Sequence, residues 1–287
     1  MIGRIRLILV TSVLMIMVIG VIPASGCPAG QQVVADNGIL NYNIGRSCVP
    51  YLYYITCSSL NTSSPVGLIV PLYEYPSADW ATLASLKQEY FVVPIIVIIN
   101  PDSGAGASYD PTYAAYVRML QMSNIVVYGY VATGYGKVAS GYVEASMIQY
   151  SDWYHVGGIF LDEMQGGMLG YQAYYGNLTA YAHSIGLKTI ANPGTSVICS
   201  YIHTVDSLTI DESQGLPTLS FLSTASCGDT ASNFNFISYG VGALPSQTWL
   251  DSTAQYVSYV WITDQTATYN NLPSYLTQEM SLLAQTP

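Results

Sequence analysis

The chain has 287 residues, and hydrophobic residues make up 51% of it, which is enough for a sizeable core. Only 8% of the residues are charged, against the ~25% of an average domain, and the formal net charge is −10 at pH 7. Such an acidic chain lacks the basic surface that binds phosphates, so we exclude a nucleic-acid-binding protein.

The first 26 residues have the pattern of an export signal. A basic stretch, Gly3 to Arg6, precedes the apolar run from Leu7 to Ile22, and small residues follow. We predict that residues 1–26 are a cleaved signal peptide or, as the alternative, an uncleaved membrane anchor. A third interpretation is a lipid anchor on Cys27, because Ala24 to Cys27 resembles a lipoprotein box. We therefore expect an extracellular or cell-surface protein.

The five cysteines are Cys27, Cys48, Cys57, Cys199 and Cys227. No two of them have the C-x-x-C spacing of a zinc site. Disulfides are the expected state in an exported chain, but the odd number leaves the connectivity open. If Cys27 carries a lipid, the natural pairs are the two that are local in sequence, Cys48–Cys57 and Cys199–Cys227.

After a polar, turn-rich segment, eight apolar runs follow one another along the chain. Residues 27–65 are predicted to be an N-terminal extension that packs on the main body. The predicted strands are 66–73, 93–99, 125–131, 157–161, 187–191, 207–210, 234–238 and 257–262. Continuous apolar runs are typical of strands that are buried on both faces.

Amphipathic stretches separate these runs. The predicted helices are 79–90, 110–122, 141–154, 170–185, 246–255 and 273–283, with shorter segments at 195–203 and 213–226. We expect Asp79 to cap the first helix, and Asp110 and Pro111 to open the second. Eight strand–helix units predict an α/β fold, a single-domain (β/α)₈ TIM barrel over residues 66–287. The alternative, an open doubly wound sheet, lacks its usual G-x-G-x-x-G loop.

Acidic residues lie where two of the predicted strands end. Asp162 and Glu163 follow the fourth strand, and Asp211 and Glu212 follow the sixth. The C-terminal ends of the strands form the active-site face of such a barrel, so Asp162, Glu163 and Glu212 are the candidate catalytic residues. If both members of the Asp162–Glu163 pair face the mouth, their repulsion raises one pKa. The alternative for the first pair is that one member is catalytic and the other caps the next helix. The alternative for Glu212 is the start of a surface helix at Asp211, because acidic residues favour helix N-termini.

The other side chains at the strand ends are mainly phenols, amides and hydroxyls. The candidate substrate-binding residues are Tyr73, Tyr75, Asn100, Tyr130, Thr133, Tyr135, Asn192, Tyr239 and Asp264. Tyrosines offer stacking faces to sugar rings, and paired carboxyl groups can flank a glycosidic bond. Asn100 and Asn192 each precede a proline, so an ordinary turn is the alternative for them. We predict a polysaccharide site without a metal or an organic cofactor, because the three histidines share no ligand spacing.

Several segments in the predicted barrel resemble those of a known family. They are VPLYEYPSADW (70–80), VIINPDSGAG (97–106), VVYGYVATGYGKV (126–138), WYHVGGIFLDE (153–163), TIANPGT (189–195) and VWITDQTATYNNLPSY (260–275). The chain resembles the spherulin-4-like proteins, or spherulation-specific family 4, which include glycoside hydrolase family 135.

The resemblance implies a (β/α)₈ barrel that cleaves α-1,4-linked galactosamine or N-acetylgalactosamine polymers, with an acidic site of Asp162, Glu163 and Glu212. Two residues depart from the family pattern. Asp211 stands where Phe is usual, and Tyr239 lies where relatives often have His, which leaves the substrate open. The leading hypothesis is a secreted or surface-anchored glycoside hydrolase. The alternative is a non-catalytic glycan-binding surface protein, because a fold alone does not establish catalysis.

Overall fold

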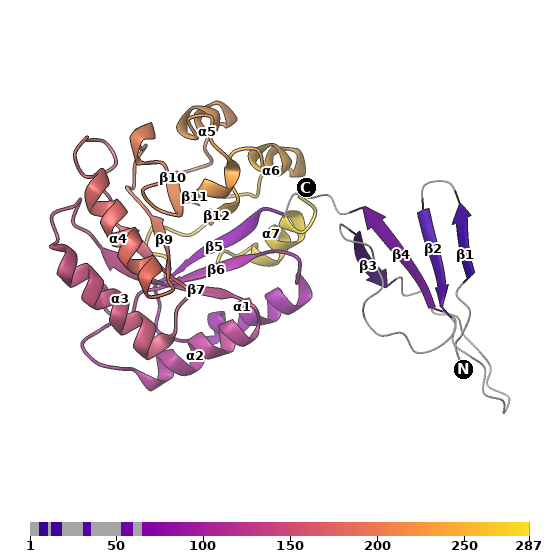
Figure 1. Cartoon of the computed structure of the whole chain (residues 1–287), viewed down its shortest axis with the longest axis horizontal. Helices are drawn as coiled ribbons and strands as arrows, with labels where there is room; N and C mark the ends of the chain where they lie inside the picture. Colours follow the sequence, from indigo (N-terminus) through magenta and orange to yellow (C-terminus); the bar gives the residue numbers. More distant parts are fainter. Residues whose placement is uncertain (1–5, 11–12, 19–30, 36–52, 60–64, 287) are drawn as a thin grey trace. The chain divides into compact units, whose positions relative to one another are not determined.

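The chain divides into two compact units, Met1–Ser64 and Pro65–Pro287. The computed structural model (Figure 1) describes residues 6–10, 13–18, 31–35, 53–59 and 65–286. The first unit contains an antiparallel sheet with the strand order β1-β2-β4-β3. Its strands are β1 (Arg6–Val10), β2 (Val13–Val18), β3 (Gln31–Ala35) and β4 (Tyr53–Ser59). The export signal, the membrane anchor and the extension stay predictions, and Cys27 and Cys48 lie outside the described residues.

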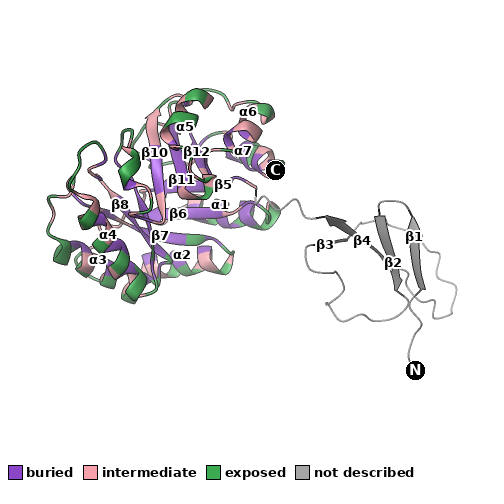
Figure 2. Cartoon of the chain, turned by 45° about the horizontal axis from the view of Figure 1, so that its top comes forward, coloured by how far each residue is buried: buried purple, intermediate pink, exposed green. Residues whose placement is uncertain are grey.

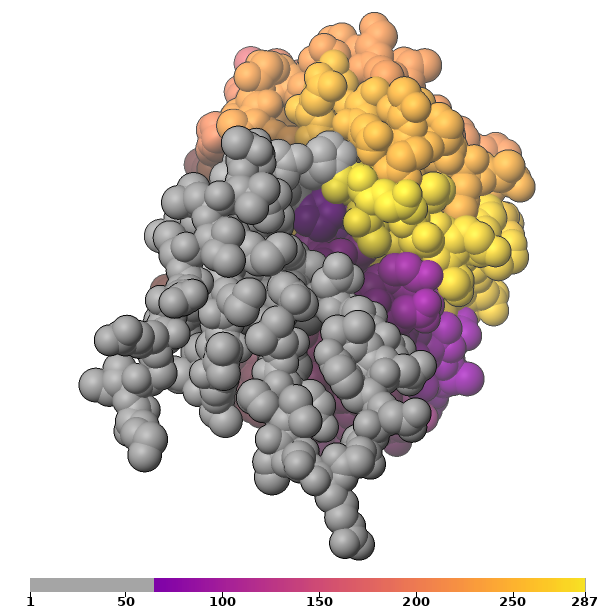
Figure 3. Space-filling view, turned by 90° about the vertical axis from the view of Figure 1, so that its right-hand side faces the viewer, coloured from indigo at the N-terminus to yellow at the C-terminus, as the bar shows by residue number. Residues whose placement is uncertain are grey.

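The second unit is a closed barrel of eight parallel strands, as predicted. Its strands are β5 (Gly67–Leu72), β6 (Ile95–Ile99), β7 (Val126–Ala132), β8 (Gly158–Asp162), β9 (Lys188–Ala191), β10 (Ser207–Gln214), β11 (Phe234–Tyr239) and β12 (Tyr259–Ile262). The last strand pairs with the first, with Tyr259 opposite Gly67, and this pairing closes the barrel. Figure 3 shows the C-terminal residues beside the first strand–helix unit, where the Val66 backbone N–H donates to Thr286 Oγ1 over 2.9 Å.

The helices surround the barrel (Figure 1). They are α1 (Ala78–Glu89), α2 (Pro111–Met122), α3 (Ser140–Tyr154), α4 (Gln172–Ser184), α5 (Leu219–Ala225), α6 (Gln247–Thr253) and α7 (Leu276–Leu283). Two short 3₁₀ turns, η1 (Cys199–Tyr201) and η2 (Ala231–Asn233), complete the unit, so the predicted helix 195–203 is reduced to one turn.

The predicted cap of the first helix is wrong. The helix begins at Ala78, one residue earlier than expected, and Ser77 Oγ accepts the backbone N–H of Asp79 over 3.1 Å. Asp79 therefore lies in the first turn, where its carboxylate accepts the backbone N–H of Leu272. The second helix begins as predicted, because Asp110 Oδ1 accepts the backbone N–H groups of Thr112 and Tyr113.

The barrel strands are buried from both sides. Every residue of β5 and β6 is buried, and Figure 2 shows purple strands enclosed by helices whose outer faces are green. The helices cover the outside of the barrel, and side chains from neighbouring strands fill its inside. This double burial is the reason for the continuous apolar runs in the sequence. No helix in the described part of the chain is long and apolar enough to span a membrane.

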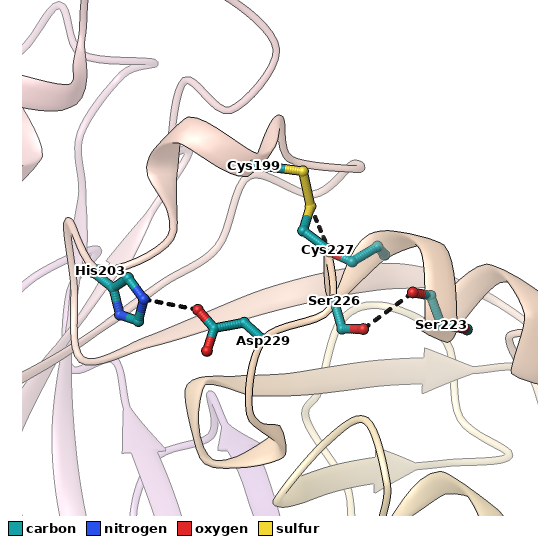
Figure 4. The surroundings of a disulfide bond; sticks show 7 residues. Cys199, His203, Ser223, Ser226, Cys227 and Asp229 are labelled. Carbon is teal, nitrogen blue, oxygen red and sulfur yellow. Dashed lines mark hydrogen bonds and ion pairs between the residues drawn. A yellow bond between two sulfur atoms is a disulfide. The ribbon is translucent and has the colours of Figure 1, made fainter.

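A disulfide joins Cys199 to Cys227, with their Cα atoms 5.9 Å apart. It confirms one of the two predicted pairs, and Figure 4 shows it beside the ion pair of His203 and Asp229. The bond connects the segment between β9 and β10 to the end of α5 and so ties down two loops of the barrel. The other predicted pair includes Cys48, which is outside the described residues.

Candidate active site

Two of the predicted acidic residues lie on strands that are separated by one strand in the barrel. Asp162 is the last residue of β8, and Glu212 lies within β10. The predicted end of the sixth strand at residue 210 is wrong, because β10 continues to Gln214 and pairs with β11 as far as Tyr239. Asp211 and Glu212 therefore belong to the strand and do not begin a helix. The pairing of β10 with β11 shifts its register between Thr209 and Asp211, directly before Glu212.

Asn192, which follows the intervening strand β9, joins the two carboxylates. Its Nδ2 group donates to Asp162 Oδ1 over 3.0 Å and to Glu212 Oε2 over 2.5 Å. Its Oδ1 atom accepts the backbone N–H of Gly194 over 2.9 Å, which fixes the orientation of the amide. Because both carboxylate oxygens contact one nitrogen, they lie at most about 5.5 Å apart.

Tyr269 forms a hydrogen bond with the second carboxylate oxygen of Glu212. Its Oη donates to Glu212 Oε1 over 2.6 Å, and the residue is 5% exposed. Burial and the neighbouring carboxylate raise the pKa of Tyr269, so the phenol keeps its proton and remains a donor. The rings of Tyr130 and Tyr269 both pack edge-on against Tyr73, at centroid distances of 5.5 and 5.8 Å. These three tyrosines form an aromatic wall beside the carboxylates.

The carboxyl group of Asp162 has a strongly raised pKa. Burial raises its pKa from 3.8 to about 6, because a carboxylate loses its hydration in this position. A hydrogen bond from Tyr130 and one from the backbone of Glu163 counter this rise, whereas the charges of Glu212 and Glu163 add to it. The expected repulsion between adjacent acids is therefore present, but burial is the larger cause.

Glu163 occupies a strained position directly after the strand. Its φ angle is +51°, in the left-handed region that is uncommon for residues with a side chain. Its carbonyl accepts the backbone N–H of Tyr135 over 2.7 Å and the hydroxyl of Thr133 over 2.8 Å, and these bonds hold the turn. The turn keeps the carboxyl groups of Asp162 and Glu163 close enough to interact at the mouth.

Three of the predicted substrate-binding residues use their polar side-chain atoms in hydrogen bonds within the protein. Thr133 is fully buried, and its hydroxyl bonds the carbonyls of Asp162 and Glu163. Asn100 Oδ1 accepts the backbone N–H of Gly104, which is the turn that its sequence allowed as an alternative. Asp264 accepts bonds from Ser274 and Gln265, which outweigh burial and lower its pKa. These residues shape the loops around the site.

The remaining candidates differ in how close they lie to the two acids. Tyr73, Tyr130 and Asn192 are part of the cluster described above. Tyr239 ends β11, is half-buried, and lies close enough to affect the pKa of Tyr269. Tyr75 and Tyr135 are 57% and 48% exposed. Sequence reasoning missed Tyr269, although it lies in the segment 260–275 that carries the family resemblance.

The donors around both carboxylates are neutral. Asn192, Tyr269 and Tyr130 supply them, together with one backbone N–H. Within the described residues, no group of three His, Cys, Asp or Glu side chains is arranged to hold a metal ion. The arrangement suits proton transfer and nucleophilic attack by carboxyl groups in a site lined with aromatic rings.

Comparison with known proteins identifies the family of the barrel. The family model described as spherulation-specific family 4 matches residues 67–283, which is the whole barrel. The chain belongs to spherulation-specific family 4. Spherulin-4 from Physarum polycephalum is 32% identical over 255 residues, which cover 83% of this chain and 75% of that protein. The family predicted from the sequence motifs is thereby confirmed.

A solved structure shows the same fold. The crystal structure of Aspergillus clavatus Sph3 in complex with GalNAc superposes with a TM-score of 0.71. The two sequences are 23% identical, and the match covers 77% of this chain and 98% of the Sph3 chain. At this level of identity the likeness establishes the barrel fold.

Proposed function

We propose that this family member is a glycoside hydrolase that cleaves an amino-sugar polysaccharide, with Asp162 as the proton donor and Glu212 as the nucleophile. The observation that carries the proposal is the pair of carboxyl groups that share Asn192 but differ in their surroundings. A glycosidase needs one carboxyl group that is protonated and a second that is ionised. The relative solved with GalNAc supports the class of sugar.

The surroundings of the two groups suggest their roles. The pKa of Asp162 is raised to about 6, so this group carries a proton at mildly acidic pH and can donate it to the leaving oxygen. Both oxygens of Glu212 accept hydrogen bonds, from Asn192 and Tyr269, and these bonds hold the group in place for attack on the anomeric carbon. Glu163, held in its strained turn, keeps a further negative charge near Asp162 and so helps Asp162 to retain its proton.

The spacing favours retention of the anomeric configuration. Retaining enzymes hold their carboxyl groups ~5–5.5 Å apart, and inverting enzymes hold them ~6.5–9.5 Å apart to admit a water molecule. The bridged oxygens of Asp162 and Glu212 are at most about 5.5 Å apart, which is shorter than the separation in inverting enzymes. In the proposed first step, Glu212 attacks the anomeric carbon while the proton of Asp162 passes to the leaving sugar oxygen. Water then cleaves the glycosyl ester, and Asp162 takes a proton from that water.

The proposed place of action is outside the cell or at its surface. The Cys199–Cys227 disulfide supports this, because such bonds persist in oxidising compartments. The export signal predicted for residues 1–26 points the same way. We therefore propose that the amino-sugar polymer is an extracellular material.

Product release measured by mass spectrometry tests the reaction. The full-length chain and its Glu212→Gln variant are incubated with galactosamine-based and glucosamine-based polymers between pH 4 and pH 8. We expect oligosaccharides from the parent chain, none from Glu212→Gln, and full activity from Glu89→Gln, a control at an exposed position on α1. Nuclear magnetic resonance of the first product should show the retained anomer. If a polymer binds but is never cut, the protein is a glycan-binding surface protein instead.

A further inference from the structure

A cavity of about 600 Å³ lies outside the cluster of catalytic candidates. Its walls come mainly from the segments that follow β5 and β6, and they include Tyr75, Asp102, Tyr109 and Asp110. Both segments leave the C-terminal ends of their strands, so the cavity belongs to the same side of the barrel as Asp162 and Glu212. Its volume is in the range of ordinary ligand sites.

Two exposed tyrosines of this cavity pack against two buried tyrosines. Tyr75 and Tyr109 are 57% and 51% exposed, whereas Tyr113 and Tyr154 are 3% and 2% exposed. The ring of Tyr109 stacks on Tyr154 with an interplanar angle of 19°, and Tyr75 packs edge-on against Tyr113. Large rings that are exposed but fixed in orientation offer a flat face to a sugar ring at little entropic cost.

The polar contacts of the cavity also fix its walls. Tyr75 Oη donates to Asp110 Oδ2 over 3.2 Å, and Tyr113 Oη donates to the carbonyl of Glu74 over 3.2 Å. The backbone N–H of Asp110 donates to Tyr154 Oη over 3.3 Å. These bonds join the loop after β5 to the start of α2, so the cavity is formed before a ligand arrives.

The charges in the cavity are negative. Asp102 and Asp110 line it, and no Lys, Arg or His is found among its described lining residues. Asp110 is already engaged as a helix cap and by Tyr75. Asp102 is exposed, and its side chain is free to accept a donor from a ligand. Such a cavity repels anionic sugars and favours a cationic one.

We propose that this cavity is a remote subsite that binds one hexosamine unit with a free ammonium group, its ring against Tyr109 and its ammonium at Asp102. The inference rests on the proposed hydrolase function and deepens it, because it requires a polymer that is at least partly de-N-acetylated. None of the residues that line the cavity belongs to the cluster around Asp162 and Glu212, so a unit bound here lies outside the place of cleavage. The subsite thus selects the polymer without taking part in the chemistry.

Calorimetric binding in the Glu212→Gln background tests the subsite, because bound oligomers stay uncut. The probes are an α-1,4-linked galactosamine heptamer and its fully N-acetylated counterpart. Tyr109→Ala should weaken binding of both by about 3- to 10-fold, the size of a lost aromatic contact. Asp102→Asn should weaken only the free-amine heptamer, by about 2- to 5-fold, and high salt should remove this difference.

Matched controls come from helix α3, whose exposed residues Tyr142 and Asp152 do not line the cavity. Tyr142→Ala and Asp152→Asn should leave both dissociation constants unchanged. If Tyr109→Ala and Asp102→Asn also change nothing while the parent chain cleaves polymer, the subsite is refuted and the hydrolase proposal stands. Tighter binding of the N-acetylated heptamer with no effect of Asp102→Asn refutes recognition of the ammonium group. If the parent chain neither binds nor cleaves any galactosamine or glucosamine polymer, both proposals fail.

Discussion

Replacing Asp162 by Asn should stabilise the barrel while it abolishes the proposed activity. Burial raises the pKa of this carboxyl group from 3.8 to about 6. The unfolded chain releases the proton near pH 4, so the folded chain loses stability as the pH rises from about 4 to about 6. A shift of ~2 pKa units at ~1.4 kcal/mol each corresponds to a loss of roughly 3 kcal/mol above that window.

An asparagine avoids this loss because it does not ionise. Its Oδ1 atom can still accept from Asn192, as Asp162 does over 3.0 Å. The variant should therefore match the parent chain near pH 4 and exceed it by up to roughly 3 kcal/mol at pH 7. For a barrel of this size, the gain corresponds to an increase of roughly 6–12 °C in the unfolding temperature. Stability gained by removing a catalytic group is a common trade-off.

Differential scanning calorimetry at pH 4, 5, 6 and 7 checks both the size and the pH window. Asp152→Asn, an exposed aspartate on α3, is the matched control and should not change the unfolding temperature at any pH. An equal gain for Asp162→Asn at every pH would show that its charge is not the cause. A variant that is less stable than the parent chain at pH 7 would show that Asp162 ionises without penalty, and its role as proton donor would lose its basis.

Three further predictions concern the same site and the disulfide. The kcat/KM of the parent chain should fall above about pH 6, tenfold per pH unit, as Asp162 loses its proton; a profile that is flat up to pH 8 excludes Asp162 as the donor. Asn192→Ala removes the amide that donates to both Asp162 and Glu212, so kcat should fall about 10- to 100-fold, and the pKa that limits activity at high pH should rise. An unchanged pH profile would contradict a role of these hydrogen bonds. Replacing Cys199 and Cys227 by Ser should lower the free energy of unfolding in urea by roughly 3–4 kcal/mol, and an unchanged midpoint argues against the cross-link.

Most of the barrel could be predicted because burial on both faces leaves a direct trace in the sequence. All eight apolar runs from residue 66 onward correspond to strands of the barrel. The main error in a strand end occurs in β10, which continues through Asp211 and Glu212 to Gln214. Backbone pairing with β11 does not require apolar side chains, and side chains at the mouth face a site and not the core. The end of an apolar run therefore marks the end of burial and not the end of the strand.

The carboxylates of the site could be predicted, but their partners could not. Asp162 and Glu212 stand out because acidic residues are rare in this chain and these two directly follow predicted strands. Tyr269 is 57 residues away from Glu212 and is one of 26 tyrosines, so nothing local distinguishes it. Thr133 shows the opposite error, a predicted ligand contact that is structural. Its position at the end of β7 suggested a ligand contact, but its buried hydroxyl is used by the backbone after β8.

The neutral character of the donors explains how Asp162 can keep a raised pKa beside a second carboxyl group. Asn192, Tyr130 and Tyr269 hold Asp162 and Glu212 in place without adding positive charge. A Lys or Arg at the same distance would lower the pKa of a neighbouring acid by ~1–3 units, and Asp162 would no longer carry a proton near pH 6. Amide and phenol donors fix geometry more strongly than they change charge, so burial remains the dominant effect on Asp162. A site that must position two acids and still keep one of them protonated therefore favours neutral partners.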